Sequence, residues 1–103
     1  MNRGDVYDVQ FPHGRHPAVI ATRASAIPLL RSVTVVGITS RVRGLPTEVP
    51  LGKEQGLARD CVANCDNLFT LDKRSFGAYR GSLGFDDARR LDRSLAIALD
   101  LEA

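Results

Sequence analysis

The apolar residues of this chain change their spacing near residue 86, and that change limits the possible folds more than any other feature. Ahead of it lie short runs of apolar residues, of which the β-branched run Val33–Thr39 is the clearest strand. After it, apolar residues recur at helical spacing through Asp86–Leu101, with arginines and aspartates on the other face and Gly84 as an acceptable N-cap. Five or six strands followed by one terminal helix predict a β-rich α+β fold, in which a helix covers one face of a small, strongly bent antiparallel sheet or barrel.

The expected strands are short and follow one another without repeats or linkers. They cover Asp5–Phe11, Pro17–Thr22, Val33–Thr39, Thr47–Leu51, Asp60–Asp66 and Asn67–Leu71. Pro17–Thr22 is typical of a central strand buried on both faces, whereas Pro50 indicates that Thr47–Leu51 is an edge strand. Ala24–Ser32 is either a loop or a single helical turn, and Gly52–Gly56 is a turn region.

Length and charge favour a single domain over residues 1–103 with only a local basic surface. The formal net charge is +2, which is too weak to imply a coat of nucleic acid. Only Lys53 and Lys73 are lysines, so the other twelve of the 14 cations are arginines, which favour bidentate contact with phosphate; high genomic G+C content would give the same bias. No apolar run approaches the length of a membrane span, and no signal peptide precedes the first strand, so we expect a cytoplasmic protein.

Several classes of chemistry lack their sequence signatures. Cys61 and Cys65 are the only cysteines, and two thiols at this spacing form neither a tetrahedral zinc site nor a redox CxxC, so we expect buried, reduced side chains. The chain has no HExxH motif, no Gly-rich phosphate loop and no GxSxG elbow. We therefore expect no metal and no cofactor.

The segment Gly14–Ala21 carries the most informative chemistry. A basic tip with an imidazole runs directly into an apolar run, which is typical of a loop that enters a buried strand. Pro17 fixes its own φ and biases His16 away from the helical region, so we expect Arg15 and His16 to be held at the mouth of that strand. An arginine is a permanent cation and a histidine can move a proton near neutral pH, a combination that suits work on a phosphodiester.

A series of short motifs resembles one known family. They are Arg3-Gly4-Asp5-Val6-Tyr7, Pro17-Ala18-Val19-Ile20, Ile38-Thr39-Ser40, Glu48-Val49-Pro50-Leu51, Gly56-Leu57, Cys65-Asp66-Asn67 and Leu71-Asp72-Lys73-Arg74, followed by the closing helix. Their order and spacing resemble the MazF/PemK toxins of bacterial type II toxin–antitoxin systems over nearly the whole length.

The resemblance implies a specific fold and activity. Such toxins are small SH3-like antiparallel barrels of five to seven strands with a C-terminal α-helix, and they act as homodimers. They cut single-stranded RNA at short sequences without a metal, using the ribose 2′-hydroxyl to give 2′,3′-cyclic phosphate and 5′-hydroxyl ends. A cognate antitoxin inhibits by placing a flexible C-terminal segment in the RNA groove. Related barrels can instead poison DNA gyrase, so a non-catalytic module that binds gyrase, nucleic acid or antitoxin is the alternative.

One departure from the family falls at the candidate catalytic position. His16 stands where the family usually has an arginine, and Arg15 is one residue earlier. Either the loop is re-registered so that Arg15 reaches the phosphate, or His16 has taken over as an acid–base group, or the toxin is weakened and retains only antitoxin binding. We assign Arg15 to stabilise the phosphorane, His16 to carry a proton and Thr39 to bind the phosphate.

The resemblance also indicates RNA-binding residues beside Thr39. The Thr39 position matches a hydroxyl at the end of the third strand of the family, where it can donate to a non-bridging phosphate oxygen. Ser40 would be a secondary contact. Arg41 and Arg43 follow in a loop, where they either contact flanking phosphates or are simply solvated.

Two further positions complete the candidate RNA surface. Asp66 and Asn67 stand at the place of an Asp-Gln pair of the family, while Asn64 replaces an arginine found in some members. Asp66 either orients a base or holds a loop by accepting backbone donors, and we favour the second role. His13 is either an exposed turn residue or a partner of His16, stacking on a base or carrying the second proton.

Overall fold

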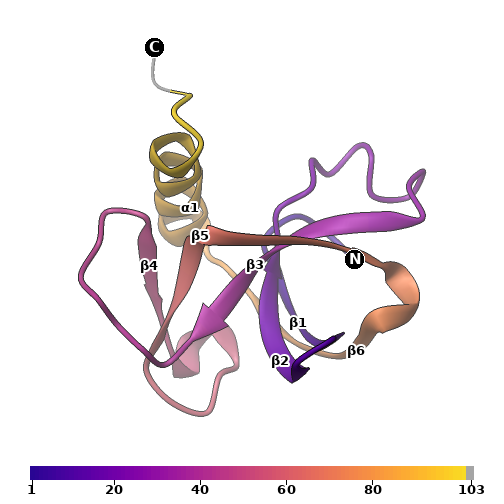
Figure 1. Ribbon diagram of the computed structural model, residues 1–103, viewed down its shortest axis with the longest axis horizontal. Helices are drawn as coiled ribbons and strands as arrows, with labels where there is room; N and C mark the ends of the chain where they lie inside the picture. The colour runs from indigo at the N-terminus through magenta and orange to yellow at the C-terminus, as the bar shows by residue number, and fades with distance from the viewer. Residues whose placement is uncertain (102–103) are drawn as a thin grey trace.

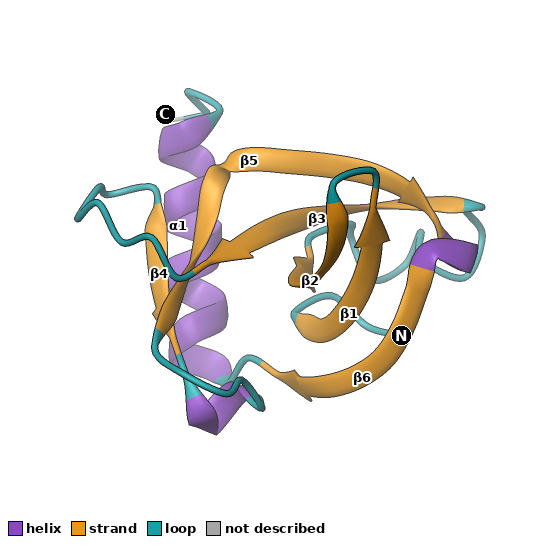
Figure 2. Ribbon diagram, turned by 60° about the horizontal axis from the view of Figure 1, so that its bottom comes forward, coloured by secondary structure: helices purple, strands orange, loops and turns teal. Residues whose placement is uncertain are grey.

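One six-stranded antiparallel sheet, curled on itself, forms the fold in the computed structural model, which describes residues 1–101 (Figure 1). The strands are β1 (Asp5–Phe11), β2 (Gly14–Ile20), β3 (Ser32–Thr39), β4 (Glu48–Leu51), β5 (Cys61–Asp72) and β6 (Phe76–Ser82). Their spatial order is β4-β5-β3-β2-β1-β6. The one α-helix within residues 1–101, α1 (Phe85–Ala98), packs against β4 and β5 (Figure 2). The predicted β-rich α+β fold is confirmed, as is the position of β4 at a sheet edge.

The curl brings the two edges of the sheet close to each other. A 3₁₀ turn, η1 (Lys53–Gln55), follows edge strand β4 and packs on the opposite edge strand, β6. Gly56 ends this turn with a φ of 83°, and a side chain there would overlap the backbone carbonyl of Arg80 in β6. Only glycine tolerates both the left-handed conformation and this backbone approach, so Gly56 permits the half-barrel to form.

Three predicted boundaries were wrong. The second strand begins at Gly14 instead of Pro17, because Arg15 and His16 pair with Gln10 and Val9 across a hairpin whose turn is Pro12–His13. Arg15 and His16 therefore lie inside a strand and not on a loop at its mouth. The predicted strands Asp60–Asp66 and Asn67–Leu71 are one strand, β5, and the helix ends at Ala98 instead of Leu101.

Strand β6 was missed altogether. Its sequence Phe76–Ser82 contains two glycines and has mostly exposed side chains, so it lacks the alternation that marks a strand. It is held by antiparallel pairing to β1, with register shifts on both sides of Tyr7. Pairing of two segments about 70 residues apart in the chain thus determines its structure, and a local pattern could not reveal it.

Two buried clusters lie on opposite faces of the central strands. One contains Val19 of β2 and Val36 of β3 together with Leu91 of the helix. The other contains Ile20 of β2 and Val35 of β3 together with residues of β1. Alternate residues of β2 and β3 therefore serve both clusters, which confirms the prediction that β2 is a central strand buried on both faces.

The two thiols belong to the first cluster. Cys61 and Cys65 are both buried and free, as predicted. Burial raises the pKa of the Cys65 thiol to about 11. No helix within residues 1–101 is both long enough and apolar enough to cross a membrane.

Candidate functional site

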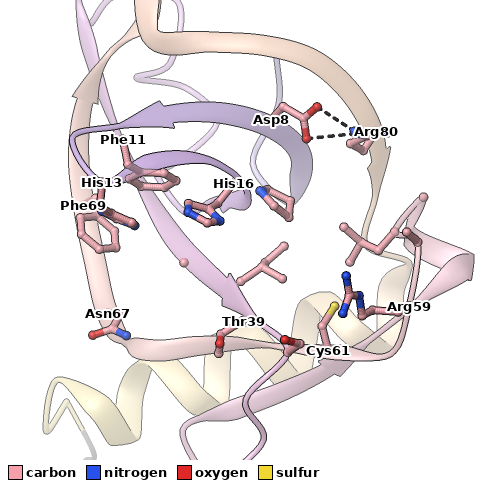
Figure 3. A pocket seen from close by; sticks show the side chains of 17 residues that line it. Asp8, Phe11, His13, His16, Thr39, Arg59, Cys61, Asn67, Phe69 and Arg80 are labelled. Atoms are coloured by element: carbon pink, nitrogen blue, oxygen red, sulfur yellow. Dashed lines mark hydrogen bonds and ion pairs between the residues drawn. The ribbon is translucent and has the colours of Figure 1, made fainter.

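A groove opens where strands β2 and β3 separate. The ladder between them joins Ala18–Ile20 to residues 35–37 and stops at Pro17, which has no N–H to donate to a neighbouring strand. Beyond that point β2 continues as His16, and β3 continues as Ile38 and Thr39. His16, Ile38 and Thr39 line a cavity of about 570 Å³, which is the groove (Figure 3).

A bulge in β5 shapes the other wall of this groove. Val36 of β3 pairs with Leu68, but the next residue, Gly37, pairs with Asn64, so residues 65–67 of β5 have no partner in β3. Such a bulge bends a strand and changes the direction of its side chains. Asn67 and Phe69 line the groove as a result, and a side chain at Gly37 would crowd the Phe69 ring.

Four rings form an aromatic wall at one end of the groove. The imidazoles of His13 and His16 are stacked with their centroids 5.1 Å apart, and His13 also stacks on Phe11 at 5.2 Å. Phe69 meets Phe11 edge-on at 4.9 Å. Both histidines are exposed to solvent, so this cluster presents two imidazoles to a ligand in the groove (Figure 3).

Thr39 and Ser40 supply hydroxyl groups on the β3 side. The Thr39 Oγ1 accepts the backbone N–H of Arg41 at 3.1 Å, which fixes the hydroxyl and leaves its own proton available to a ligand. Ser40 is exposed and also lines the groove. A hydroxyl held in this way is a ready hydrogen-bond donor to an anion.

Two arginines that the sequence analysis did not single out, Arg59 and Arg80, also line the groove. Arg80 forms an ion pair with Asp8, in which Nη2–Oδ2 is 2.8 Å and Nε–Oδ1 is 3.0 Å. Arg59 precedes β5 and lies beside Cys61 (Figure 3). The sequence could have indicated Arg59 as a site residue, because it stands directly before the start of an expected strand. It could not have indicated Arg80, which lies on the strand that was missed.

Four of the predicted site residues lie outside the groove lining. Arg15 points the other way, and one of its guanidinium nitrogens would be 2.5 Å from a Cβ at Gly77 in β6. Asp66 accepts a 2.7 Å hydrogen bond from the Thr47 hydroxyl, so its donor is a side chain and not the backbone N–H groups expected from sequence. Arg41 and Arg43 are exposed in the loop after β3.

That loop is held by a single carboxylate. Glu48 accepts the backbone N–H groups of Arg43, Gly44 and Leu45 at 2.8 to 3.2 Å. The backbone of the loop is therefore fixed, while the arginine side chains extend into solvent beside the groove.

The groove thus combines two imidazoles, a fixed hydroxyl, an amide and two guanidinium groups. These groups can transfer protons and bind an anion, which is what cleavage of a phosphodiester needs. Within residues 1–101 no cluster of three or more His, Cys, Asp or Glu side chains is arranged to hold a metal ion.

Comparisons with known proteins agree with this chemistry. Residues 2–99 match the family model for the PemK-like, MazF-like toxin of type II toxin–antitoxin systems. The endoribonuclease MazF3 of Mycobacterium tuberculosis is 38% identical over 86 residues, which are 84% of each chain. The endoribonuclease MazF4 of that organism is 30% identical over 99 residues, which are 96% of this chain and 92% of the relative.

Solved structures of similar chains have the same fold. The M. tuberculosis toxin MazF-mt6 superposes with a TM-score of 0.91 at 34% identity, covering 96% of this chain and 99% of that chain. A mycobacterial endoribonuclease in complex with its cognate antitoxin gives a TM-score of 0.91 at 30% identity, covering 100% and 98%.

Proposed function

The chain belongs to the PemK/MazF family of type II toxins and is an endoribonuclease, and from this premise we propose that it cleaves single-stranded RNA at short sequences, with the ribose 2′-hydroxyl as nucleophile and without a metal. The observation that carries this proposal is the pair of stacked imidazoles facing the Thr39 hydroxyl in one groove. Three rings of the aromatic wall, those of Phe11, His13 and Phe69, suit a splayed base, because unstacked bases of single-stranded RNA pack on aromatic rings.

In the proposed reaction one histidine accepts a proton as the general base and the other donates a proton as the general acid. Neutral His16 takes the proton of the 2′-hydroxyl while the 2′-oxygen bonds to phosphorus. The bond from phosphorus to the 5′-oxygen breaks, and that oxygen takes a proton from protonated His13. The products are a 2′,3′-cyclic phosphate and a 5′-hydroxyl. Thr39 donates its hydroxyl proton in a hydrogen bond to a non-bridging phosphate oxygen, where negative charge increases.

We also propose that the groove is the site of regulation. The solved complex of a similar chain with its cognate antitoxin supports an antitoxin partner for this chain. As the family resemblance implies, an antitoxin partner of this chain would place a flexible C-terminal segment in the groove and so exclude RNA. The protein would act as a homodimer, with the RNA lying across both chains.

Purified protein and a mixed-sequence single-stranded RNA in excess EDTA test this function. We expect discrete fragments that end in 2′,3′-cyclic phosphate. His16→Ala and Thr39→Ala should abolish them, whereas Arg74→Ala, a matched change at a 90% exposed side chain outside the groove lining, should not. RNA that stays intact over many sequences and protein concentrations would refute the proposal and favour a binding module that acts on gyrase or antitoxin.

A further inference from the structure

We propose that Arg59, and not Arg15, supplies the cation that binds the scissile phosphate and stabilises its transition state. This inference rests on the proposed function and names a further catalytic residue for the same reaction. The sequence favours Arg15 for the role because Arg15 adjoins His16. Three features of the structure assign it to Arg59 instead.

The first feature is the direction of Arg15. Its guanidinium lies over Gly77 of β6, and Arg15 does not line the groove. Neighbouring residues of a strand point to opposite faces, so His16 and Arg15 cannot both face the same ligand while β2 keeps its register with β1. Because the pairs Gln10–Arg15 and Val9–His16 fix that register, a small loop movement does not bring Arg15 into the groove.

The second feature is that the two arginines that line the groove, Arg59 and Arg80, differ in their partners. Arg80 is held by Asp8 through two contacts of 2.8 and 3.0 Å, which satisfy two of its donors and neutralise its charge. Among residues 1–101, Arg59 forms neither an ion pair nor a side-chain hydrogen bond. Its donors are therefore available to a ligand, and its charge is not compensated by a bound carboxylate.

The third feature is that the backbone of Arg59 is anchored on both sides. Leu57, two residues before it, is buried, and its N–H donates to the Gly52 carbonyl at 3.2 Å. Cys61, two residues after it, is buried at the start of β5. The exposed arginine thus extends from a short, tethered connection toward the groove, across from His13 and His16 (Figure 3).

A guanidinium in this place suits the reaction. It can bind both non-bridging oxygens of a phosphodiester with parallel N–H groups, and these bonds strengthen as the phosphorane gains negative charge. Arg59 remains protonated throughout, so the proton transfers between RNA and the histidines are unchanged. Thr39 and Arg59 would then hold the phosphate from the two sides of the groove.

The test compares Arg59→Ala, Arg59→Lys and Arg15→Ala with the wild-type protein on one cleavable oligonucleotide. Arg59→Ala should lower kcat by about 10²–10³-fold, as loss of a transition-state donor does, with a smaller change in KM. Arg59→Lys should recover part of that loss because it restores the charge without the fork. Arg15→Ala should stay within about threefold of wild type, since surface changes away from the ligand have small effects.

The outcomes separate this inference from the proposed function. Wild-type protein that leaves RNA intact would overturn both. Wild-type protein that cleaves, together with an Arg59→Ala variant that cleaves equally well, would overturn the Arg59 assignment alone. An Arg15→Ala variant more damaged than Arg59→Ala would also overturn it. Thermal unfolding of each variant excludes misfolding, and Arg59, being exposed and unbonded, should leave the midpoint unchanged.

Discussion

The two halves of the β2–β3 pair differ sharply although they belong to the same strands. From Ala18 to Ile20 the strands are paired, and their side chains are fully buried in two apolar clusters. From Pro17 back to Gly14, β2 pairs with β1 alone, and the groove takes the place of the missing ladder. One residue without an N–H thus separates the half that is buried in the fold from the half in which we propose the chemistry.

Because of this difference, we expect stability and activity to respond to different residues. The paired half is supported by Leu91 of the helix, which has no exposed surface. The parted half, which consists of residues 14–17 of β2 with Ile38 and Thr39 of β3, presents exposed polar side chains such as His16, whose packing is limited to the rings of His13 and Phe11.

The largest effect is expected from His16→Ala in the parted half. The rate of RNA cleavage should fall by about 10²–10⁴-fold, which is the usual contribution of a positioned acid–base group. The free energy of unfolding should change by no more than about 1 kcal/mol, because the exposed side chain packs only on the His13 and Phe11 rings. Initial cleavage rates and urea unfolding measure the two quantities. A loss of stability in proportion to the loss of rate would contradict the separation.

The opposite pattern is expected from Leu91→Ala in the paired half. Removing this buried side chain should lower the free energy of unfolding by about 2–5 kcal/mol, since a cavity remains in the first cluster. Cleavage per folded molecule should be unchanged at a temperature where the variant is folded. Calorimetry and kinetics on the same sample check this, and a variant that is stable but inactive would show that the halves are coupled.

A smaller effect on stability is expected from the ionisation of Cys65. Burial raises the pKa of this thiol from its ordinary value of 9.0 to about 11, so between these values the unfolded chain loses the proton and the folded chain keeps it. The free energy of unfolding should therefore fall as the pH rises from 9 to 11. The Cys65→Ala variant, unfolded over the same pH range, should show a flatter dependence, and an identical slope would refute the assignment.

The smallest effect is expected from Thr47→Val, which removes the hydroxyl that donates to Asp66. Loss of one hydrogen bond of this kind should cost about 1 kcal/mol of stability. Because Asp66 adjoins Asn67 in the β5 bulge, the substitution also tests whether the bulge must be fixed for cleavage. Thr70→Val, on an exposed part of the same sheet, is the matched control. Equal effects of the two changes would show that the Asp66 contact has no special role.

The elements that could be predicted are those with a local pattern. The apolar residues Val6, Val9 and Phe11, although they alternate imperfectly, and the helical spacing after Gly84 both led to the correct element. His16, Thr39 and Asn67 were also identified, and the structure brings all three to the groove lining. Their proposed roles remain predictions.

What could not be predicted depends on contacts between distant parts of the chain. The start of β2 at Gly14 is set by pairing with β1, and this pairing decides that Arg15 and His16 face opposite ways. The Asp8–Arg80 ion pair requires β6, which has no strand pattern of its own. Arg59 lines the groove from the connection that precedes β5, and no local pattern shows that this connection lies opposite His13 and His16 (Figure 3).

An NMR titration tests most directly whether the groove between β2 and β3 is the reaction centre. The ligand is an oligonucleotide that carries a 2′-deoxy residue at the cleavage site and so cannot react. If the parted half of β2 and β3 is the reaction centre, the largest shift changes will fall on His16, Thr39 and Arg59, and the amides around Leu91 will barely move. Changes centred on the second pocket, lined by Arg31, Asp72, Lys73 and Arg74, with the groove unchanged, would instead show that RNA binds away from β2 and β3.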